Sequence, residues 1–353
     1  MSPFKAYLIE KKEGGASGSL VTMSESELDP GEVTIRVAYS SVNYKDALAA
    51  TGAGRIIRRY PCVGGIDLSG TVECSTDPRF RSGDAVLATS FDIGVAHHGG
   101  YAEYARVPAQ WVVPLPAGLS LHAAMALGTA GFTAALGIVR MEENGLTPSK
   151  GPIIVTGATG GVGSLAIDML AGRGYQVTAF TAKETQSDYL KGLGATAVLL
   201  RSAVDPARIR PLDKALWAGA VDNLGGNVLA WIVSTMQQGG TIASIGLALD
   251  ATLNTTVMPF ILRGACLLGI DSGYIGNRTA AVFGSAWPAT CDRDTCRRWY
   301  APSVSTNFPG PSTTTLRVGH TAAWSSKSPA RKTPRLDRNR EIRWRIATSG
   351  LAY

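Results

Sequence analysis

A glycine-rich stretch in the middle of the chain carries the clearest chemical signal. Residues 153–163 read Ile-Ile-Val-Thr-Gly-Ala-Thr-Gly-Gly-Val-Gly, and Ser164–Leu170 then carries apolar residues at helical spacing. A buried strand, a glycine turn and a helix open a dinucleotide-binding βαβ unit, because backbone without Cβ atoms can approach a pyrophosphate that the helix N-terminus attracts. The residues expected to cradle those phosphates are Thr159, Gly160, Gly161 and Val162.

The end of the next expected strand, Gln176–Thr181, bears on which dinucleotide binds. An NAD site usually has Asp or Glu at this point, where the carboxylate binds the ribose 2′-hydroxyl. Here the residues are Phe180-Thr181-Ala182-Lys183, so the acid is missing and a cation is present. Thr181 can donate a hydrogen bond to a 2′-phosphate and Lys183 can neutralise it. The pattern favours NADPH, although Lys183 alone is equally compatible with a solvated loop lysine.

Length and composition set wider limits. A chain of 353 residues with 45% apolar content predicts about two globular domains. No run of 18 apolar residues is free of charge or glycine, and the N-terminus lacks the apolar core of a signal peptide, so we expect no membrane segment. Five scattered cysteines do not form a disulfide framework, which favours a cytoplasmic protein.

The net charge of +7 is unevenly distributed. Residues 275–353 contain 13 Lys and Arg against 4 Asp and Glu, whereas the first 274 residues contain 21 against 23. All the excess positive charge therefore lies in the last fifth of the chain. This distribution excludes a globally basic nucleic-acid-binding protein.

The first third of the chain has the pattern of a β-rich domain. Residues 1–12 alternate as an edge strand would, and Val33–Tyr39 alternates more cleanly. Further short strands are expected within 64–72, 83–88, 99–107 and 111–116, separated by glycine and proline turns. Short strands with such turns predict a barrel-like domain over residues 1–120.

The period changes after residue 120. Leu121–Val139 predicts helix, interrupted near Thr129-Ala130-Gly131, and strands and helices then alternate up to the strand Cys266–Ile270. This alternation predicts a doubly wound α/β domain over residues 121–274.

Five stretches now match one family in order. They are Ser41–Asp46, Gly65-Ile66-Asp67, Gly99–Glu103, Gly128–Ala134 and the glycine turn at 156–163. The chain resembles the medium-chain dehydrogenase/reductase superfamily, in the quinone-oxidoreductase-like branch that contains NADPH-dependent acrylyl-CoA reductases. The resemblance covers about residues 3–274 and implies a GroES-like catalytic domain followed by a Rossmann domain.

The resemblance also implies further cofactor contacts. It places Tyr44 on the nicotinamide side and adds Arg201 as a 2′-phosphate contact. Leu247, Ile261 and Ser272 follow as other cofactor contacts. Tyr44, Asn43 and Asp46 are the catalytic candidates, although Asp46 could equally bind a helix N-terminus or a neighbouring lysine.

A catalytic metal is not expected. Zinc alcohol dehydrogenases of this superfamily use an early Cys and a Gly-His-Glu, and the matching stretches here are Asn43–Asp46 and Gly65-Ile66-Asp67. Ile66 cannot ligate a metal, and no cluster of four cysteines offers a structural zinc site. Without a Lewis acid, hydride transfer from NADPH to an activated C=C, as in acrylyl-CoA, or to a quinone fits better than alcohol oxidation.

Substrate recognition and the alternatives stay open at this level. Arg55, Arg58 and Arg59 could bind the phosphates of coenzyme A, or could form a solvated basic loop. The expected partner is a small acyl-CoA or quinone, without nucleic acid or membrane, and the family implies a homodimer.

The glycine turn also fits the short-chain dehydrogenases, but no downstream Tyr has Lys four positions on. A non-catalytic NADPH-binding protein is the alternative from another class.

The last 79 residues do not continue these patterns. From Ile275 the periodicity stops, and four of the seven tryptophans lie among Ser, Thr, Pro and Arg. We expect residues 275–353 to be a non-family, disordered tail, although aromatic residues are unusual in disordered segments. A reading-frame shift in the gene or its record would explain the change, and a genuine basic tail that binds an anionic partner is the alternative.

Overall fold

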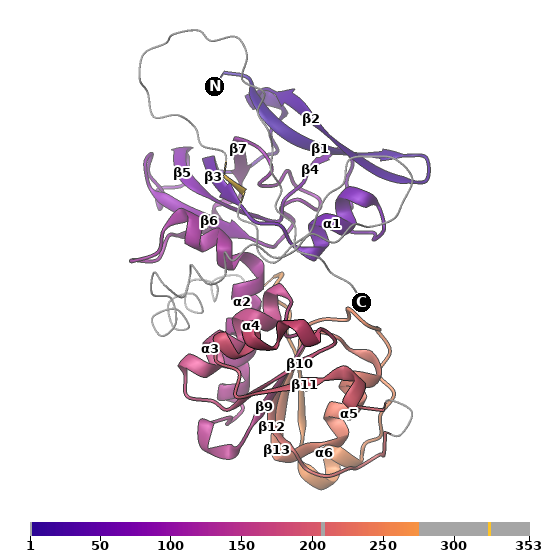
Figure 1. Cartoon of the computed structure of the whole chain (residues 1–353). Helices are drawn as coiled ribbons and strands as arrows, with labels where there is room; N and C mark the ends of the chain where they lie inside the picture. The colour runs from indigo at the N-terminus through magenta and orange to yellow at the C-terminus, as the bar shows by residue number, and fades with distance from the viewer. Residues whose placement is uncertain (1, 206–208, 275–323, 326–353) are drawn as a thin grey trace. The chain divides into compact units, whose positions relative to one another are not determined.

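The computed structural model describes residues 2–205, 209–274 and 324–325 of the chain. It divides into two compact units: the first contains Met1–Thr129, and the second begins at Ala130 (Figure 1). A helix begins at Leu121, directly after the boundary expected at residue 120, and the division between the two units falls within this helix.

The first unit contains a three-stranded antiparallel sheet in the order β2-β1-β4. Its strands are β1 (Phe4–Lys12), β2 (Gly15–Met23) and β4 (Cys62–Val63). The expectation that residues 1–12 form an edge strand is wrong, because β1 lies in the middle. The alternation of β2 is obscured by small residues, and most of the strand is only partly buried.

A second antiparallel sheet supplies the core of this unit. Its strands are β3 (Val33–Ser40), β5 (Asp67–Ser75), β6 (Ala85–Thr89), β7 (Tyr104–Val107), β8 (Val112–Pro114) and β15 (Trp324–Ser325). β15, in the C-terminal segment, pairs with β3. Val33, Ile35 and Leu68 are fully buried between the strands, as their alternation predicts. The β-rich first domain is thus confirmed.

Among the described residues of the first unit, one α-helix, α1 (Tyr44–Thr51), lies wholly within it. Asn43 is its N-cap and Asp46 completes a capping box, while Gly52 ends the helix with a φ of 71°. The described part of this unit also contains two short 3₁₀ helices, η1 (Glu25–Glu27) and η2 (Ala109–Trp111).

Helix α2 (Leu121–Glu143) is broken at Gly128, where φ is 47° and ψ is −152°. The interruption expected near Thr129 is therefore present, one residue earlier. α2 is long and apolar enough to cross a membrane, but 72% of its most apolar window is buried inside the protein. It is accordingly a core helix.

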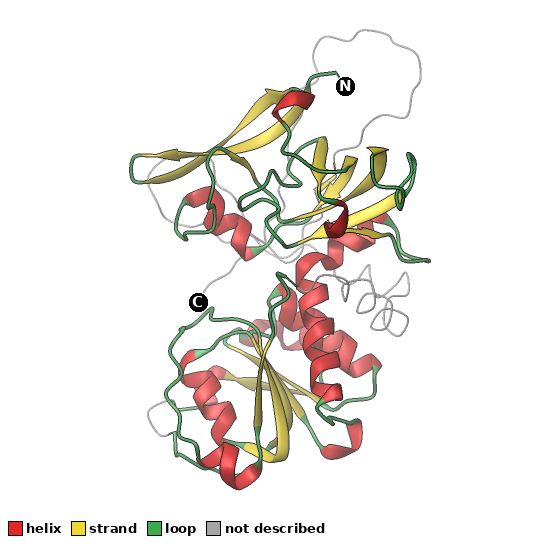
Figure 2. Ribbon diagram, turned by 180° about the vertical axis from the view of Figure 1, so that it is seen from behind, coloured by secondary structure: helices red, strands yellow, loops and turns green. Residues whose placement is uncertain are grey.

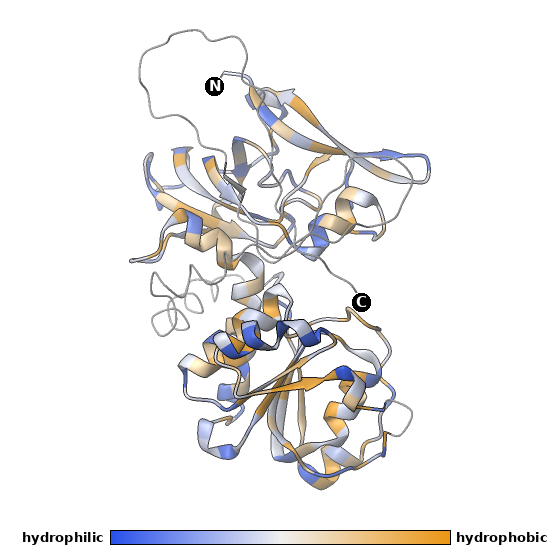
Figure 3. Ribbon diagram, viewed as in Figure 1, coloured by the Kyte–Doolittle hydropathy of each residue, from blue (hydrophilic) through white to orange (hydrophobic). Residues whose placement is uncertain are grey.

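The second unit is a parallel six-stranded sheet in the order β11-β10-β9-β12-β13-β14. The strands are β9 (Ile153–Thr156), β10 (Val177–Thr181), β11 (Ala197–Leu200), β12 (Trp217–Asp222), β13 (Met236–Ser244) and β14 (Cys266–Gly269). The strands are rich in hydrophobic residues (Figure 3), as expected for strands buried on both faces.

Helices cover both faces of this sheet (Figure 2). They are α3 (Gly161–Gly172), α4 (Ser187–Gly192), α5 (Gly226–Ser234) and α6 (Met258–Arg263), with the 3₁₀ helices η3 (Pro148–Lys150), η4 (Glu184–Gln186) and η5 (Arg201–Ala203). The expected doubly wound Rossmann architecture is confirmed. Because all six strands are parallel, their carboxyl ends meet at one edge, where such sheets bind ligands.

Candidate cofactor and active site

The glycine turn connects β9 to α3 at the edge of the parallel sheet where the carboxyl ends of the strands meet. Gly157 has a φ of 57°, a conformation that side chains disfavour, and a Cβ at Gly163 would lie 2.3 Å from the carbonyl oxygen of Gly157. Gly160 is the N-cap of α3 and has no side chain to bind the free N–H groups of the first helical turn. Those N–H groups, from Gly161 onwards, suit a phosphate.

Strand register brings the expected 2′-phosphate contacts to the same place. Thr181 lies opposite Leu200 in the β10–β11 pairing, so Arg201 follows directly beside it. The hydroxyl of Thr181 accepts a hydrogen bond from the backbone N–H of Lys183 (3.0 Å). Partial burial lowers the pKa of Lys183. Ala182 is exposed between them, so two cations and a hydroxyl lie at the ends of adjacent strands.

The buried carboxylate of Asp222, which sequence reasoning missed, binds Thr156 directly before the glycine turn. Asp222 ends β12 and is fully buried, and it accepts hydrogen bonds from the hydroxyl of Thr156 (2.7 Å) and the N–H of Gly225 (2.9 Å). Asn223 donates its side-chain amide to the carbonyl of Thr156 (2.7 Å). Burial raises the pKa of Asp222. The only signal in the sequence was a polar pair directly after an apolar strand.

The remaining expected cofactor contacts lie further along the sheet. Leu247 is 68% exposed and lies in the loop after β13. The end of β13, this loop and the start of α5 together line a hollow of about 200 Å³. Ser272 follows β14, and its hydroxyl lies 2.7 Å from that of Thr133. Ile261 is 74% exposed on α6, whose last residue, Arg263, donates to the carbonyl of Met236 at the beginning of β13.

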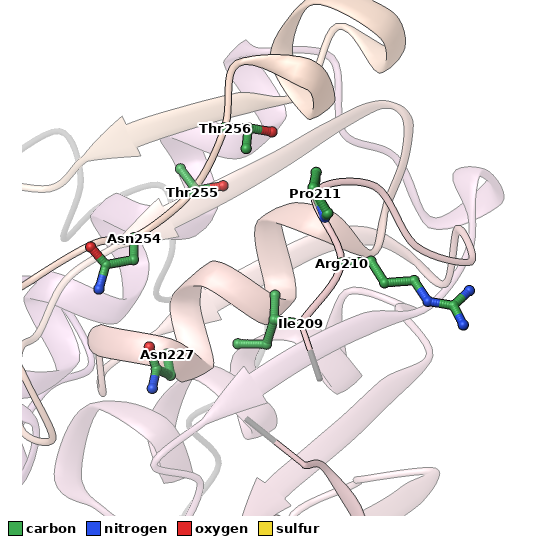
Figure 4. A pocket seen from close by; sticks show the side chains of 7 residues that line it. All are labelled: Ile209, Arg210, Pro211, Asn227, Asn254, Thr255 and Thr256. Carbon is green, nitrogen blue, oxygen red and sulfur yellow. The ribbon is translucent and has the colours of Figure 1, made fainter. Parts of the chain in front are cut away.

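A larger hollow of about 390 Å³ lies beside the start of α5, between residues 209–211 and 254–256. Its polar side chains do not converge: the guanidinium of Arg210 extends away from Asn227 and Asn254 (Figure 4). We assign it no role.

The catalytic candidates of the first unit surround the start of α1. Tyr44 is the first residue of the helix and is 45% exposed. Asp46 is buried, and its carboxylate accepts hydrogen bonds from the N–H groups of Asn43 (2.8 Å) and Ile66 (3.1 Å). Burial raises the pKa of Asp46 to about 7. Asp46 thus binds a helix N-terminus, the alternative left open by its sequence, and the side chain of Asn43 is also occupied.

A second buried carboxylate, Asp67, collects the neighbouring donors. It accepts hydrogen bonds from the hydroxyl of Ser41, from Nδ2 of Asn43 (2.8 Å), and from both the N–H (3.0 Å) and the hydroxyl (2.5 Å) of Thr129. We call Asp67 with these three donor residues the Asp67 cluster. Sequence reasoning missed it, because its members are far apart in the chain.

This arrangement does not suit zinc. Ile66, at the position of the family's ligating histidine, is buried and apolar. A Cβ at Gly128 would lie 2.7 Å from Oδ2 of Asp67, so the carboxylate is already closely surrounded. Within the described ranges, no three His, Cys, Asp or Glu side chains lie close enough together to hold a metal ion.

The basic cluster ahead of Pro61 is partly paired. Arg58 forms an ion pair with Asp92, and Arg59 forms one with Asp29 and also donates to the carbonyl of Ala96 (2.9 Å). Arg55 is exposed. Both ion pairs leave about half of each arginine side chain accessible, so a role in binding phosphates stays a prediction.

Comparison with known proteins identifies the family. Residues 29–117 match the alcohol dehydrogenase GroES-like domain, and residues 161–285 match the zinc-binding dehydrogenase family. The chain is 51% identical to a putative quinone oxidoreductase, YhfP, of Bacillus subtilis over 77% of this chain and 82% of that protein. It is 48% identical to the acrylyl-CoA reductase AcuI of Ruegeria pomeroyi over 76% and 82%.

Solved structures of two oxidoreductases are similar to this chain in both sequence and fold. The yhdH oxidoreductase of Salmonella enterica in complex with NADP is 46% identical, with a TM-score of 0.81 over 83% of this chain and 90% of that one. Bacillus subtilis yhfP with NAD bound is 48% identical, with a TM-score of 0.81 over 85% and 91%. The family match extends past Tyr274, where the resemblance was expected to end, to residue 285. The chain belongs to the medium-chain dehydrogenase/reductase superfamily, in its quinone-oxidoreductase-like branch.

Proposed function

We propose that this oxidoreductase is a zinc-independent enzyme that transfers hydride from NADPH to an activated C=C, most specifically that of an enoyl thioester such as acrylyl-CoA. The observation that carries the proposal is the Asp67 cluster, in which a buried carboxylate satisfied by neutral donors occupies the place of a metal centre. An activated C=C needs no Lewis acid to accept hydride. The relative named acrylyl-CoA reductase supports the substrate class.

NADPH is the proposed cofactor because the carboxyl edge carries cations and no carboxylate at the end of β10. Thr181, Lys183 and Arg201 would hold the 2′-phosphate, and the turn at Gly160 and Gly161 would hold the pyrophosphate. A relative solved with NADP supports this preference, and another solved with NAD makes it worth testing.

When bound, NADPH supplies the hydride that the β-carbon of the substrate receives. Negative charge then develops on the thioester oxygen, and a donor held there would contribute the largest catalytic effect. We assign this role to the hydroxyl of Tyr44 or to neighbouring backbone N–H groups. Asn43 and Asp46 would hold the first turn of α1, and with it Tyr44, because their polar groups form the capping box of this helix. Water or a tyrosine protonates the α-carbon.

Turnover with defined acceptors tests the function. The purified protein, dialysed against a chelator, is assayed with NADPH and either acrylyl-CoA or 1,4-benzoquinone, and products are identified by mass spectrometry. We expect propionyl-CoA, with a kcat/KM for acrylyl-CoA at least tenfold above that for the quinone. The reverse order would favour an NADPH:quinone reductase, and NADPH binding without turnover of either acceptor would favour a non-catalytic binding protein.

The protein is further proposed to be cytoplasmic and homodimeric, by analogy with its family. For the C-terminal segment, we propose that residues 275–353 result from a shift in reading frame; apart from Trp324 and Ser325 they lie outside the described residues. Sequencing of the coding DNA across codons 268–280 tests this. An uninterrupted frame, together with an active full-length protein, would instead support a genuine basic tail.

A further inference from the structure

We propose that Asp67 is a positioning residue, which sets the orientation of Tyr44 by holding the start of α1; this inference rests on the proposed role of Tyr44. Asp67 is 0% exposed. Its carboxylate accepts hydrogen bonds from three parts of the chain. The donors are Ser41 directly after β3, Asn43 at the N-cap of α1 and Thr129 after the break in α2.

Two of the donors begin helices. Asn43 is the N-cap of α1, and its Nδ2 lies 2.8 Å from Oδ2 of Asp67. Thr129 follows the break at Gly128, and its N–H, which belongs to the first turn of the restarting helix, donates to Asp67. The positive end of the helix dipole also stabilises a carboxylate there. One side chain therefore fixes two helix starts relative to each other.

A carboxylate suits this place because the side chain receives several donors at once. Four donor groups converge on the two carboxylate oxygens of Asp67. An amide in its place would remove the negative charge that these donors bind, and its NH₂ group would oblige the Thr129 hydroxyl to turn and accept a hydrogen bond, which weakens a buried cluster.

The start of α1 is held from both sides. The side chain of Asn43 is bound by Asp67, while its backbone N–H is bound by Asp46 (2.8 Å). Tyr44 is the next residue, and its side chain is exposed rather than fixed by burial. A small rotation of the first helical turn would carry the Tyr44 side chain with it and displace its hydroxyl from the substrate. Misplacement of about 1 Å can cost a factor of about 100 in rate.

A reciprocal exchange of the two side chains tests the proposal. Asp67→Asn places an amide against the amide of Asn43, and Asn43→Asp places two carboxylates together. In the double variant an amide at position 67 can again donate to a carboxylate at position 43, which is also a good N-cap. Asp84→Asn, at an exposed aspartate in the same unit, is the matched control.

The readouts are kcat per NADPH-binding molecule, the Kd for NADPH, and hydrogen–deuterium exchange of the peptide that contains α1. We expect each single variant to lose at least tenfold in kcat, to keep its Kd for NADPH within threefold, and to exchange faster at α1. We expect the double variant to be at least fivefold faster than either single variant. A merely structural role would lower the folded fraction without changing kcat per NADPH-binding molecule.

Two results would overturn the proposal. One is a kcat of Asp67→Asn within threefold of the unmodified protein. The other is a double variant that recovers slow exchange at α1 but not kcat. If the unmodified protein reduces neither acrylyl-CoA nor a quinone, the proposed function fails. The exchange data still decide whether Asp67 holds the start of α1.

Discussion

The hydroxyl of Thr156 donates a hydrogen bond to the buried carboxylate of Asp222 (2.7 Å) and accepts one from the N–H of Asn223 (2.9 Å). One hydroxyl thus ties the end of β9, just before the glycine turn, to the loop after β12. The turn depends on this contact, because its own glycines contribute no side chains to hold it.

Thr156→Val should therefore weaken both the fold and the cofactor site. It keeps the shape but leaves a buried N–H and a carboxylate oxygen each short of a partner, which we expect to cost about 1–3 kcal/mol of unfolding free energy. The Kd for NADPH should rise severalfold. Urea unfolding and fluorescence titration measure the two effects, with the exposed Thr147→Val as control. Equal stability of the two variants would show that the contact is dispensable.

Lys183→Ala should weaken the binding of NADPH but not that of NADH. Loss of a charge-assisted contact to the 2′-phosphate is expected to raise the Kd for NADPH about tenfold or more, because such contacts contribute about 1.5–3 kcal/mol. The Kd for NADH should stay within twofold. Lys191→Ala, at an exposed lysine on α4, should change neither value. Should the variant weaken both cofactors alike, Lys183 would not be the residue that distinguishes them.

The buried carboxyl of Asp46 predicts a pH-dependent stability. Burial raises its pKa from 3.8 to about 7, so the folded protein binds the proton more tightly than the unfolded chain. The stability that this proton provides is complete below pH 3.8 and is lost as the pH rises through 7. Asp46→Asn does not titrate, so its unfolding free energy should fall less than that of the unmodified protein between pH 4.5 and 8. Parallel profiles would contradict the assignment.

The paired arginines offer a test of coenzyme A recognition. Arg58→Ala combined with Arg59→Ala should raise the KM for acrylyl-CoA about tenfold and leave the KM for a small quinone unchanged, because only the thioester carries phosphates. About half of each arginine side chain is exposed, so the pair with Asp92 should contribute little stability. Asp29 is only 10% exposed, so thermal unfolding of the variant checks that the loss of Arg59 leaves it folded. Arg79→Ala removes a comparable exposed pair and serves as control. Similar changes in both KM values would exclude phosphate recognition.

Much of the second unit was predictable because its signals are local. An apolar strand, a glycine turn and an apolar helix follow each other within 153–172, and the register of β10 and β11 then places Thr181 beside Arg201. Helix α1 was missed, although Asn43 and Asp46 form a capping box three residues apart. Strand β2 was missed because its glycines and serines lack a clear alternation.

The polar clusters could not be predicted in the same way. Asp67 meets Ser41 and Thr129 only because an antiparallel sheet and a broken helix bring residues 41, 67 and 129 together. Asp222 meets Thr156 across two parallel strands. Such contacts depend on the tertiary fold, and a single sequence does not show which distant polar residues will pair.

The central claim is metal-free hydride transfer to an enoyl thioester, and isotope transfer tests it most directly. NADPH carrying two deuterium atoms at C4 is incubated with the chelator-treated protein and acrylyl-CoA, and the product is analysed by mass spectrometry and NMR. The account predicts propionyl-CoA with deuterium at the β-carbon, at a rate that added Zn²⁺ does not increase. Absence of labelled propionyl-CoA, or activity that returns only when Zn²⁺ is added, would contradict it.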